Sequence, residues 1–246
     1  METKRLIIGL ALAGMFTGQA LVAADVQITN DIKDPKKTII RWDLDDTIVK
    51  KMPYKPLVRK NADAILYCLM RHPVTFFQQI KTKACSEEWQ ETFKGFNENQ
   101  NSYEHRFAQM IQQISQEKQL LPGMQELLQK LHDLGYEQHA ITNMGEKDYQ
   151  YLQQTKPEVF NLFCRATYVT YNNNKKKIKK PMPEYFTNVV ANDKNLAEKT
   201  SLFIDDKLEN CQAAQEAVGW DSIKVPGNKT NAEFLTNVLR QHGVAV

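Results

Sequence analysis

Apolar runs that end in polar side chains recur along residues 36–246, and segments of helical periodicity separate them. The last helical segment places Phe234, Leu235, Val238 and Leu239 on one face. Strands are predicted over 37–43, 136–141, 165–171, 201–204 and 223–225, and helices over 121–135, 183–191, 209–218 and 231–242. This alternation predicts an α/β protein whose Rossmann-like parallel sheet is flanked by helices.

The segment 50–119 has a different pattern, with no convincing strand. Three apolar stripes at helical spacing run through it: Val58, Ala62, Ile65, Leu66 and Leu69; Trp89 and Phe93; and Tyr103, Phe107, Met110, Ile111 and Ile114. We therefore predict a small all-helical cap, inserted after the first strand and placed to close over its end as a lid. The α/β core domain is then predicted to comprise 25–49 and 120–246.

The first 24 residues have the pattern of a signal peptide. Lys4 and Arg5 precede an apolar stretch over 6–16, and small residues follow up to a predicted cleavage site after Ala24. The alternative is an uncleaved membrane anchor, but the stretch has only about half the length that a spanning helix needs. We therefore expect an exported protein, periplasmic or secreted, with no membrane span in the mature chain.

Export would place the four cysteines in an oxidising compartment. Their spacing contains no Cys-x-x-Cys pair and suggests no zinc site. Cys68 and Cys85 fall in one segment and are candidates for a disulfide, although spacing alone does not determine connectivity. Cys164 and Cys211 are predicted to be small core residues.

Carboxylates gather where the predicted strands end. The carboxyl-end positions are Asp43, Asp45, Thr142, Asp205 and Asp206. Ligands of parallel α/β sheets bind beyond this edge. So much negative charge in one place needs a cation, and Mg²⁺ is the hard cation that takes carboxylate and backbone oxygens while keeping waters for a phosphate substrate. The sequence therefore predicts a magnesium-assisted phosphoryl-transfer site.

Four separated motifs then identify a resemblance that spans residues 36–242. They are Asp43-Leu44-Asp45-Asp46-Thr47, Thr142-Asn143, Lys180-Pro181-x-Pro183-Glu184-x-Phe186 and Phe203-Ile204-Asp205-Asp206-x3-Asn210. In this order the motifs resemble those of the haloacid dehalogenase superfamily, and more narrowly its phosphatase-like members with a helical cap after the first strand. A single Asp-x-Asp-x-Thr would be a weak signal, whereas four motifs in order are specific.

The resemblance implies roles for the acids. Asp43 is the expected nucleophile, which forms an aspartyl-phosphate, and Asp45 is the expected general acid and base. The expected metal ligands are Asp43, Asp45 through its backbone carbonyl, Asp205 and Asp206, with Asp206 the direct ligand and Asp205 a second ligand or an outer-shell partner. Asp46 is expected only to cap the following turn.

The resemblance also implies a phosphate-binding set. Thr142, Asn143 and Lys180 are expected to contact the phosphoryl group, and Thr142 and Lys180 are counted among the catalytic residues. Lys180 is favoured over Lys179 because it stands immediately before Pro181. The preceding lysines over 175–177 are expected to form a solvated loop. The sequence alone does not explain why Arg41 stands in the middle of a central strand.

These inferences together predict an exported Mg²⁺-dependent phosphatase acting on a small-molecule or macromolecular phosphate ester. The alternatives are a weakly active or inactive binding protein with this fold, a hydrolytic dehalogenase or a phosphonatase. A dehalogenase would need no second acid. A phosphonatase would need a lysine in the helical cap, and no spacing singles out one of the lysines there. The formal net charge of +3 is too small to indicate nucleic-acid binding.

Overall fold

A computed structural model describes residues 33–51, 54–81, 86–96, 99–172, 176–193, 198–227 and 230–246. The predicted signal peptide, residues 1–24, and Cys85 lie outside these ranges, so export and the Cys68–Cys85 disulfide stay predictions. Within the described residues, no helix combines the length and the apolar character needed to cross a membrane.

A five-stranded parallel sheet forms the centre of the fold, in the order β5-β4-β1-β8-β9. Its strands are β1 (Thr38–Trp42), β4 (Glu137–Ile141), β5 (Arg165–Thr167), β8 (Thr200–Asp205) and β9 (Asp221–Lys224). All residues of the central β1 are buried. Trp42 pairs with Ala140 of β4 and Ile204 of β8, so the carboxyl ends of these three strands meet at one edge. The predicted Rossmann-like sheet is confirmed.

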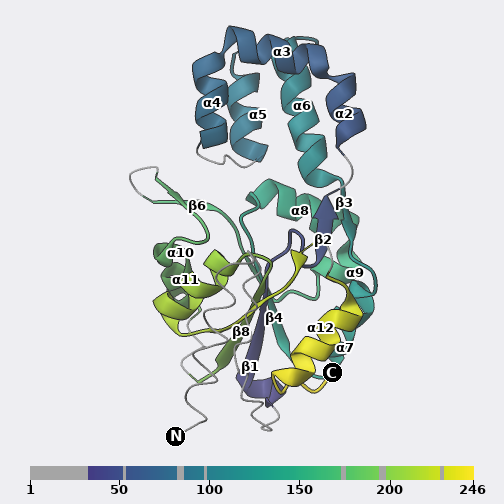
Figure 1. The fold of residues 1–246 in the computed structure, drawn as a ribbon, viewed down its shortest axis with the longest axis vertical. Coiled ribbons are helices and arrows are strands. Elements are labelled where there is room, and N and C mark those ends of the chain that lie inside the picture. The colour runs from purple at the N-terminus through teal and green to yellow at the C-terminus, as the bar shows by residue number, and fades with distance from the viewer. Residues whose placement is uncertain are drawn as a thin grey trace, which may run out of the picture. The chain divides into compact units, whose positions relative to one another are not determined.

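Helices cover both faces because side chains alternate along each strand. Ile40, Trp42 and Ile204 point into one apolar cluster, whereas Phe203 belongs to the other. Helices α10 and α11 lie on one side of the sheet and α7 and α12 on the other (Figure 1). The bounds are α7 (Met124–Asp133), α8 (Glu146–Thr155), α9 (Pro157–Phe160), α10 (Pro183–Asn192), α11 (Leu208–Val218) and α12 (Ala232–Gln241), and a short 3₁₀ turn, η2 (Pro35–Lys37), precedes β1.

Between β1 and α7 the chain forms a helical insert, defined here as residues 55–116 (Figure 1). Its helices are α2 (Lys55–Lys60), α3 (Ala62–Arg71), α4 (Pro73–Lys81), α5 (Ser86–Lys94) and α6 (Tyr103–Gln116). They have an apolar cluster of their own around Phe93 and Phe107, which Phe76 and Trp89 extend. Most residues of the predicted stripes pack in or against this cluster, but Ala62, Leu66 and Tyr103 are exposed.

The prediction that 50–119 contains no strand was wrong at both ends of that segment. β2 (Val49–Lys51) pairs antiparallel with β3 (Lys118–Leu120), where the chain leaves and rejoins the sheet. Short extended segments satisfy their backbone groups by pairing with each other, and a pattern of only three residues carries little periodicity. This two-stranded ribbon positions Lys118, which matters below.

Three smaller expectations also need correction. The helix predicted from 121 begins at Met124, because Gly123 precedes it with φ of +73°. The β-rich segment 165–171 is split into β5 and β6 (Thr170–Tyr171), and β6 pairs with β7 (Lys177–Ile178). Cys211 is buried as expected, but Cys164 is exposed.

Arg41 is completely buried in the central strand, next to a buried carboxylate. Its Nη2 donates to Asp193 Oδ2 at 2.9 Å, its Nε donates to Ser201 Oγ at 3.0 Å, and its guanidinium lies 4.4 Å from the ring centroid of Trp220. This network supplies the partners that the sequence left unassigned.

Candidate active site

Asp43 follows β1 directly, and its backbone N–H donates to the carbonyl of Ile204 at 2.8 Å. This bond extends the pairing with β8 by one residue and holds Asp43 at the carboxyl edge of the sheet, with 6 % of its surface exposed. Thr47 donates from Oγ1 to Asp43 Oδ2 at 3.4 Å. Thr47 belongs to the first motif but was given no role from the sequence.

Lys180 joins the two distant acidic motifs. Its Nζ donates at 2.6 Å to Asp43 Oδ1, at 2.6 Å to Asp205 Oδ2 and at 2.7 Å to the carbonyl of Ile141. Because the ammonium has three N–H groups, these contacts satisfy it completely. Lys180, the lysine favoured over Lys179 from the sequence, thus contacts Asp43, and its catalytic role stays a prediction.

The backbone of Lys180 is held by Asn143. The side-chain amide of Asn143 donates to the Lys180 carbonyl at 3.0 Å, and its Oδ1 accepts from the Lys180 N–H at 2.8 Å. Both polar groups of this side chain are thus used to orient the lysine. Phosphate binding by Asn143 stays a prediction, and the structure adds a positioning role that the sequence did not suggest.

Burial and charge shift the pKa values of this cluster strongly. Burial raises the pKa of Asp43 to about 8, with Asp205 adding to the rise and Lys180 opposing it. Burial by itself would lower the pKa of Lys180, but the carboxylates of Asp205 and Asp43 outweigh it and raise that pKa. A site with two buried carboxylates and one ammonium attracts further positive charge.

Asp206 completes a set of carboxylates suited to a divalent cation. One oxygen each from Asp43, Asp205 and Asp206 lies within 4.8 Å of the others. Carboxylate oxygens are ligands that Mg²⁺ prefers, so this all-oxygen donor set fits Mg²⁺. Asp205 also accepts from Asn210 Nδ2 at 2.9 Å and from the Lys207 N–H at 2.8 Å. These bonds orient Asp205 from the start of α11.

Asp45 is not part of that set of carboxylates. Its Oδ1 forms an ion pair with Lys118 Nζ at 2.5 Å, and Lys118 is 4 % exposed on β3. The implied contact of its backbone carbonyl with the metal stays a prediction. Sequence reasoning missed Lys118, because a lone lysine at the end of the insert carries no local signal.

Thr142 is buried at the end of β4. Its Oγ1 accepts from the Met144 N–H at 3.1 Å, which leaves its own O–H proton available to a phosphoryl oxygen. This arrangement is compatible with the predicted phosphate contact.

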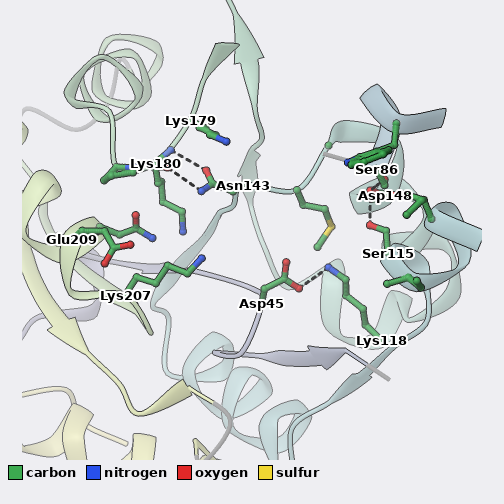
Figure 2. A pocket seen from close by; sticks show the side chains of 17 residues that line it. Asp45, Ser86, Ser115, Lys118, Asn143, Asp148, Lys179, Lys180, Lys207 and Glu209 are labelled. Atoms are coloured by element: carbon green, nitrogen blue, oxygen red, sulfur yellow. Dashed lines mark hydrogen bonds and ion pairs between the residues drawn. The ribbon is translucent and has the colours of Figure 1, made fainter. Parts of the chain in front are cut away.

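A cavity of about 400 Å³ opens over these residues. The sheet edge contributes Asp45, Asn143 and Lys180 to its lining, and the helical insert contributes Ser86, Trp89, Ile111, Ile114 and Ser115. Figure 2 shows Lys179, Lys180 and Lys207 at one end and Ser86, Ser115 and Asp148 at the other. Lys177, predicted to lie in a solvated loop, instead pairs with Glu88 of the insert, while Lys176 is exposed as predicted.

Comparisons with known proteins agree with this geometry. The family model for haloacid dehalogenase-like hydrolases matches residues 37–217, more than half of the chain. No curated protein matches the sequence. Among solved structures, a haloacid dehalogenase family enzyme of Bacteroides thetaiotaomicron, in complex with magnesium and inorganic phosphate, has a TM-score of 0.55 at 19% identity over 82% of this chain and 98% of its own.

Two further structures have the same fold. The hydrolase YfnB of Bacillus subtilis, bound to magnesium, gives a TM-score of 0.52 at 16% identity, over 83% of this chain and 98% of that one. A superfamily hydrolase of Ehrlichia chaffeensis gives 0.51 at 18% identity, over 86% and 98%. With the motifs, the fold and the matched family model in agreement, this chain belongs to the haloacid dehalogenase-like hydrolases.

Proposed function

We propose that this protein is a Mg²⁺-dependent phosphomonoesterase that works through an aspartyl-phosphate on Asp43. The observation that carries the proposal is the joint position of Asp43, Lys180 and Asp206, which three separate motifs bring to one sheet edge. The magnesium and phosphate complex of the Bacteroides relative supports the same reading. Asp43, Asp205 and Asp206 would hold the ion, which would supply positive charge beside the phosphoryl oxygens.

In the first step an Asp43 carboxylate oxygen attacks phosphorus, and the bond from phosphorus to the alcohol oxygen breaks. Asp45 gives its proton to the departing alcohol. In the second step Asp45 takes a proton from water, whose oxygen attacks phosphorus and releases Asp43 and inorganic phosphate. Lys180 holds Asp43 oriented throughout, and Thr142 donates to a phosphoryl oxygen.

The helical insert would act as the cap, since Ser86, Trp89 and Ser115 line the cavity over Asp45. A cap of this kind excludes water and contacts the alcohol part of the ester. We also propose export to the periplasm or the medium, which rests on the signal-peptide pattern over residues 1–24.

The test is hydrolysis of p-nitrophenyl phosphate by the protein expressed from its full coding sequence. We expect turnover with Mg²⁺, loss with EDTA and recovery when Mg²⁺ is returned. Asp43→Asn should abolish turnover, and Asp63→Asn, at an exposed acid on the insert, is the matched control. Turnover by Asp43→Asn at the parental rate would show that the nucleophile is wrongly assigned.

A second measurement identifies the intermediate. Acid quenching during turnover, followed by peptide mass spectrometry, should find a phosphoryl group on the peptide that contains Asp43. If the protein binds Mg²⁺ and keeps its fold but hydrolyses no ester, the alternative of an inactive binding protein replaces the proposal.

A further inference from the structure

The lining of the cavity includes one buried acid, which the proposed chemistry does not use. Asp148 lies in the first turn of α8 and is 1 % exposed. Its Oδ2 accepts from Ser86 Oγ and, at 2.7 Å, from Ser115 Oγ, both of which come from the helical insert (Figure 2). Its Oδ1 is buried without a hydrogen-bond partner. A buried oxygen of this kind normally has a donor, so the structure leaves one to be supplied.

Asp148 differs from Asp43 and Asp45 in its charge balance. Asp43 is paired with Lys180, and Asp45 is paired with Lys118. Among the described residues no lysine, arginine or histidine forms an ion pair with Asp148. Because two hydroxyl groups orient a carboxylate but do not neutralise it, its burial in the unliganded protein is unfavourable.

A further acid, Glu87, lies close to Asp148. Glu87 stands next to Ser86 in α5, and its Oε1 accepts from the Lys147 N–H at 2.5 Å. Burial raises the pKa of Glu87, and the charge of Asp148 raises it further. Trp89, an aromatic side chain of the type that attracts cations, lines the same cavity.

The two ends of the cavity differ in their charged groups: three lysines and the exposed Glu209 lie at one end, and Asp148 lies at the other. Lys179, Lys180 and Lys207 lie at the end near Asp43, and Asp148 lies across from them (Figure 2). A ligand that matches this arrangement has an anionic group at one end and a cationic group at the other. A phosphate monoester placed for attack by Asp43 would direct its alcohol part toward Trp89 and Asp148.

We propose that Asp148 is a specificity site for a protonated amine, and that the preferred substrates are phosphomonoesters of amino alcohols. This inference rests on the proposed function and narrows its substrate class. A neutral hydroxyl could also donate to Oδ1, but it would leave the charge of Asp148 unbalanced, so an ammonium is favoured.

The test uses three esters of similar length that differ in one terminal group: 2-aminoethyl, 2-hydroxyethyl and ethyl phosphate. For the wild-type holoenzyme with Mg²⁺, we expect kcat/KM to be at least about tenfold higher for the 2-aminoethyl ester than for the other two. Asp148→Asn, which keeps the shape and removes the charge, should bring the three values close together, mainly through a higher KM for the 2-aminoethyl ester.

The matched control is Glu146→Gln. It removes an exposed acid from the same helical turn, outside the cavity lining, and should leave the preference for the amine unchanged. Equal kcat/KM values for the three esters in the wild type, or a preference for the 2-hydroxyethyl ester, would overturn the inference without any variant. Retention of the preference in Asp148→Asn would overturn it as well. If the wild type hydrolyses neither these esters nor p-nitrophenyl phosphate, the proposed function itself has failed.

Discussion

Arg41 Nη2 lies 2.9 Å from Asp193 Oδ2, and both side chains are almost completely inaccessible to solvent. An arginine in the central strand of a parallel sheet is unusual, because such strands are covered on both faces. Here it connects β1 to Asp193, the residue that follows α10. Asp193 is held a second time by Arg165, whose Nη1 donates to Oδ1 at 2.5 Å.

Replacing Arg41 with Met should therefore destabilise the protein strongly. Removal of one partner of a buried ion pair leaves the other uncompensated, which typically costs about 3–5 kcal/mol. Arg165→Met is the matched comparison, since it removes a partner of the same Asp193 from a half-exposed position and should cost about 1 kcal/mol or less. Urea unfolding measures both, and equal losses would contradict the distinction.

The contribution of His139 to stability should fall on mild acidification. Arg41 Nη1 lies 3.0 Å from His139 Nδ1 and can only donate, so Nδ1 accepts and the neutral ring donates from Nε2 to Glu137 at 2.7 Å. Burial lowers the pKa of His139, and Arg41 lowers it further. Below about pH 6.5 the imidazole of His139 therefore binds a proton in the unfolded chain but not in the folded chain.

The free energy of unfolding should drop by up to about 1.4 kcal/mol per pH unit as the pH falls from about 6.5 toward the folded-state pKa, and this contribution should level off below it. His139→Gln should remove that part of the slope, whereas His132→Gln, at an exposed position, should not. The check is a set of urea titrations between about pH 7.5 and pH 5.5. A slope that is the same in wild type and His139→Gln would refute the assignment.

Lys180→Met should affect both stability and turnover. Without the ammonium, Asp43 and Asp205 face each other in the interior, and we expect a loss of about 3–5 kcal/mol in the absence of metal. Mg²⁺ should restore part of it by supplying positive charge, while kcat should fall about 10²- to 10³-fold. Lys176→Met, at an exposed lysine, is the control. A metal-free Lys180→Met as stable as the parent would disagree with the contacts described.

Replacing Asp46 with Gly should stabilise the protein. It has φ of +62°, which is strained for a residue with a Cβ, and its N–H donates to the Val49 carbonyl at 2.7 Å. Asp46→Gly should raise the free energy of unfolding by roughly 0.5–1 kcal/mol, measured by urea unfolding. Asp46→Ala, which keeps the strain, should show no gain. If Asp46→Ala is stabilised equally, relief of charge near Asp206 is the cause instead.

The sequence predicted the parts of the molecule that depend on local pattern. Asp43 and Asp205 each follow an apolar run, and the parallel topology brings their strand ends together. Lys180 was recognisable from the prolines after it. The partners of Arg41 could not be predicted, because Asp193 stands 152 positions later and belongs to no sequence pattern that connects it with the strand.

The residues that line the cavity from the insert were missed for a related reason. Ser86 and Ser115 come from different helices and meet Asp148 only in the folded protein. A serine on a helix surface carries no chemical signal in the sequence, and neither does a lone lysine such as Lys118. Cys164 was misplaced because a small residue with no charge fits a core and a surface equally well.

Asp148 Oδ2 accepts hydrogen bonds from two serine hydroxyls of the helical insert, so this carboxylate connects α8 to the insert. A displacement of the insert away from α8 would break both hydrogen bonds. Ligand capture and insert docking would then be thermodynamically coupled, so that each reinforces the other. Binding of an ammonium group at Asp148 would in this way favour the conformation in which the insert contacts α8.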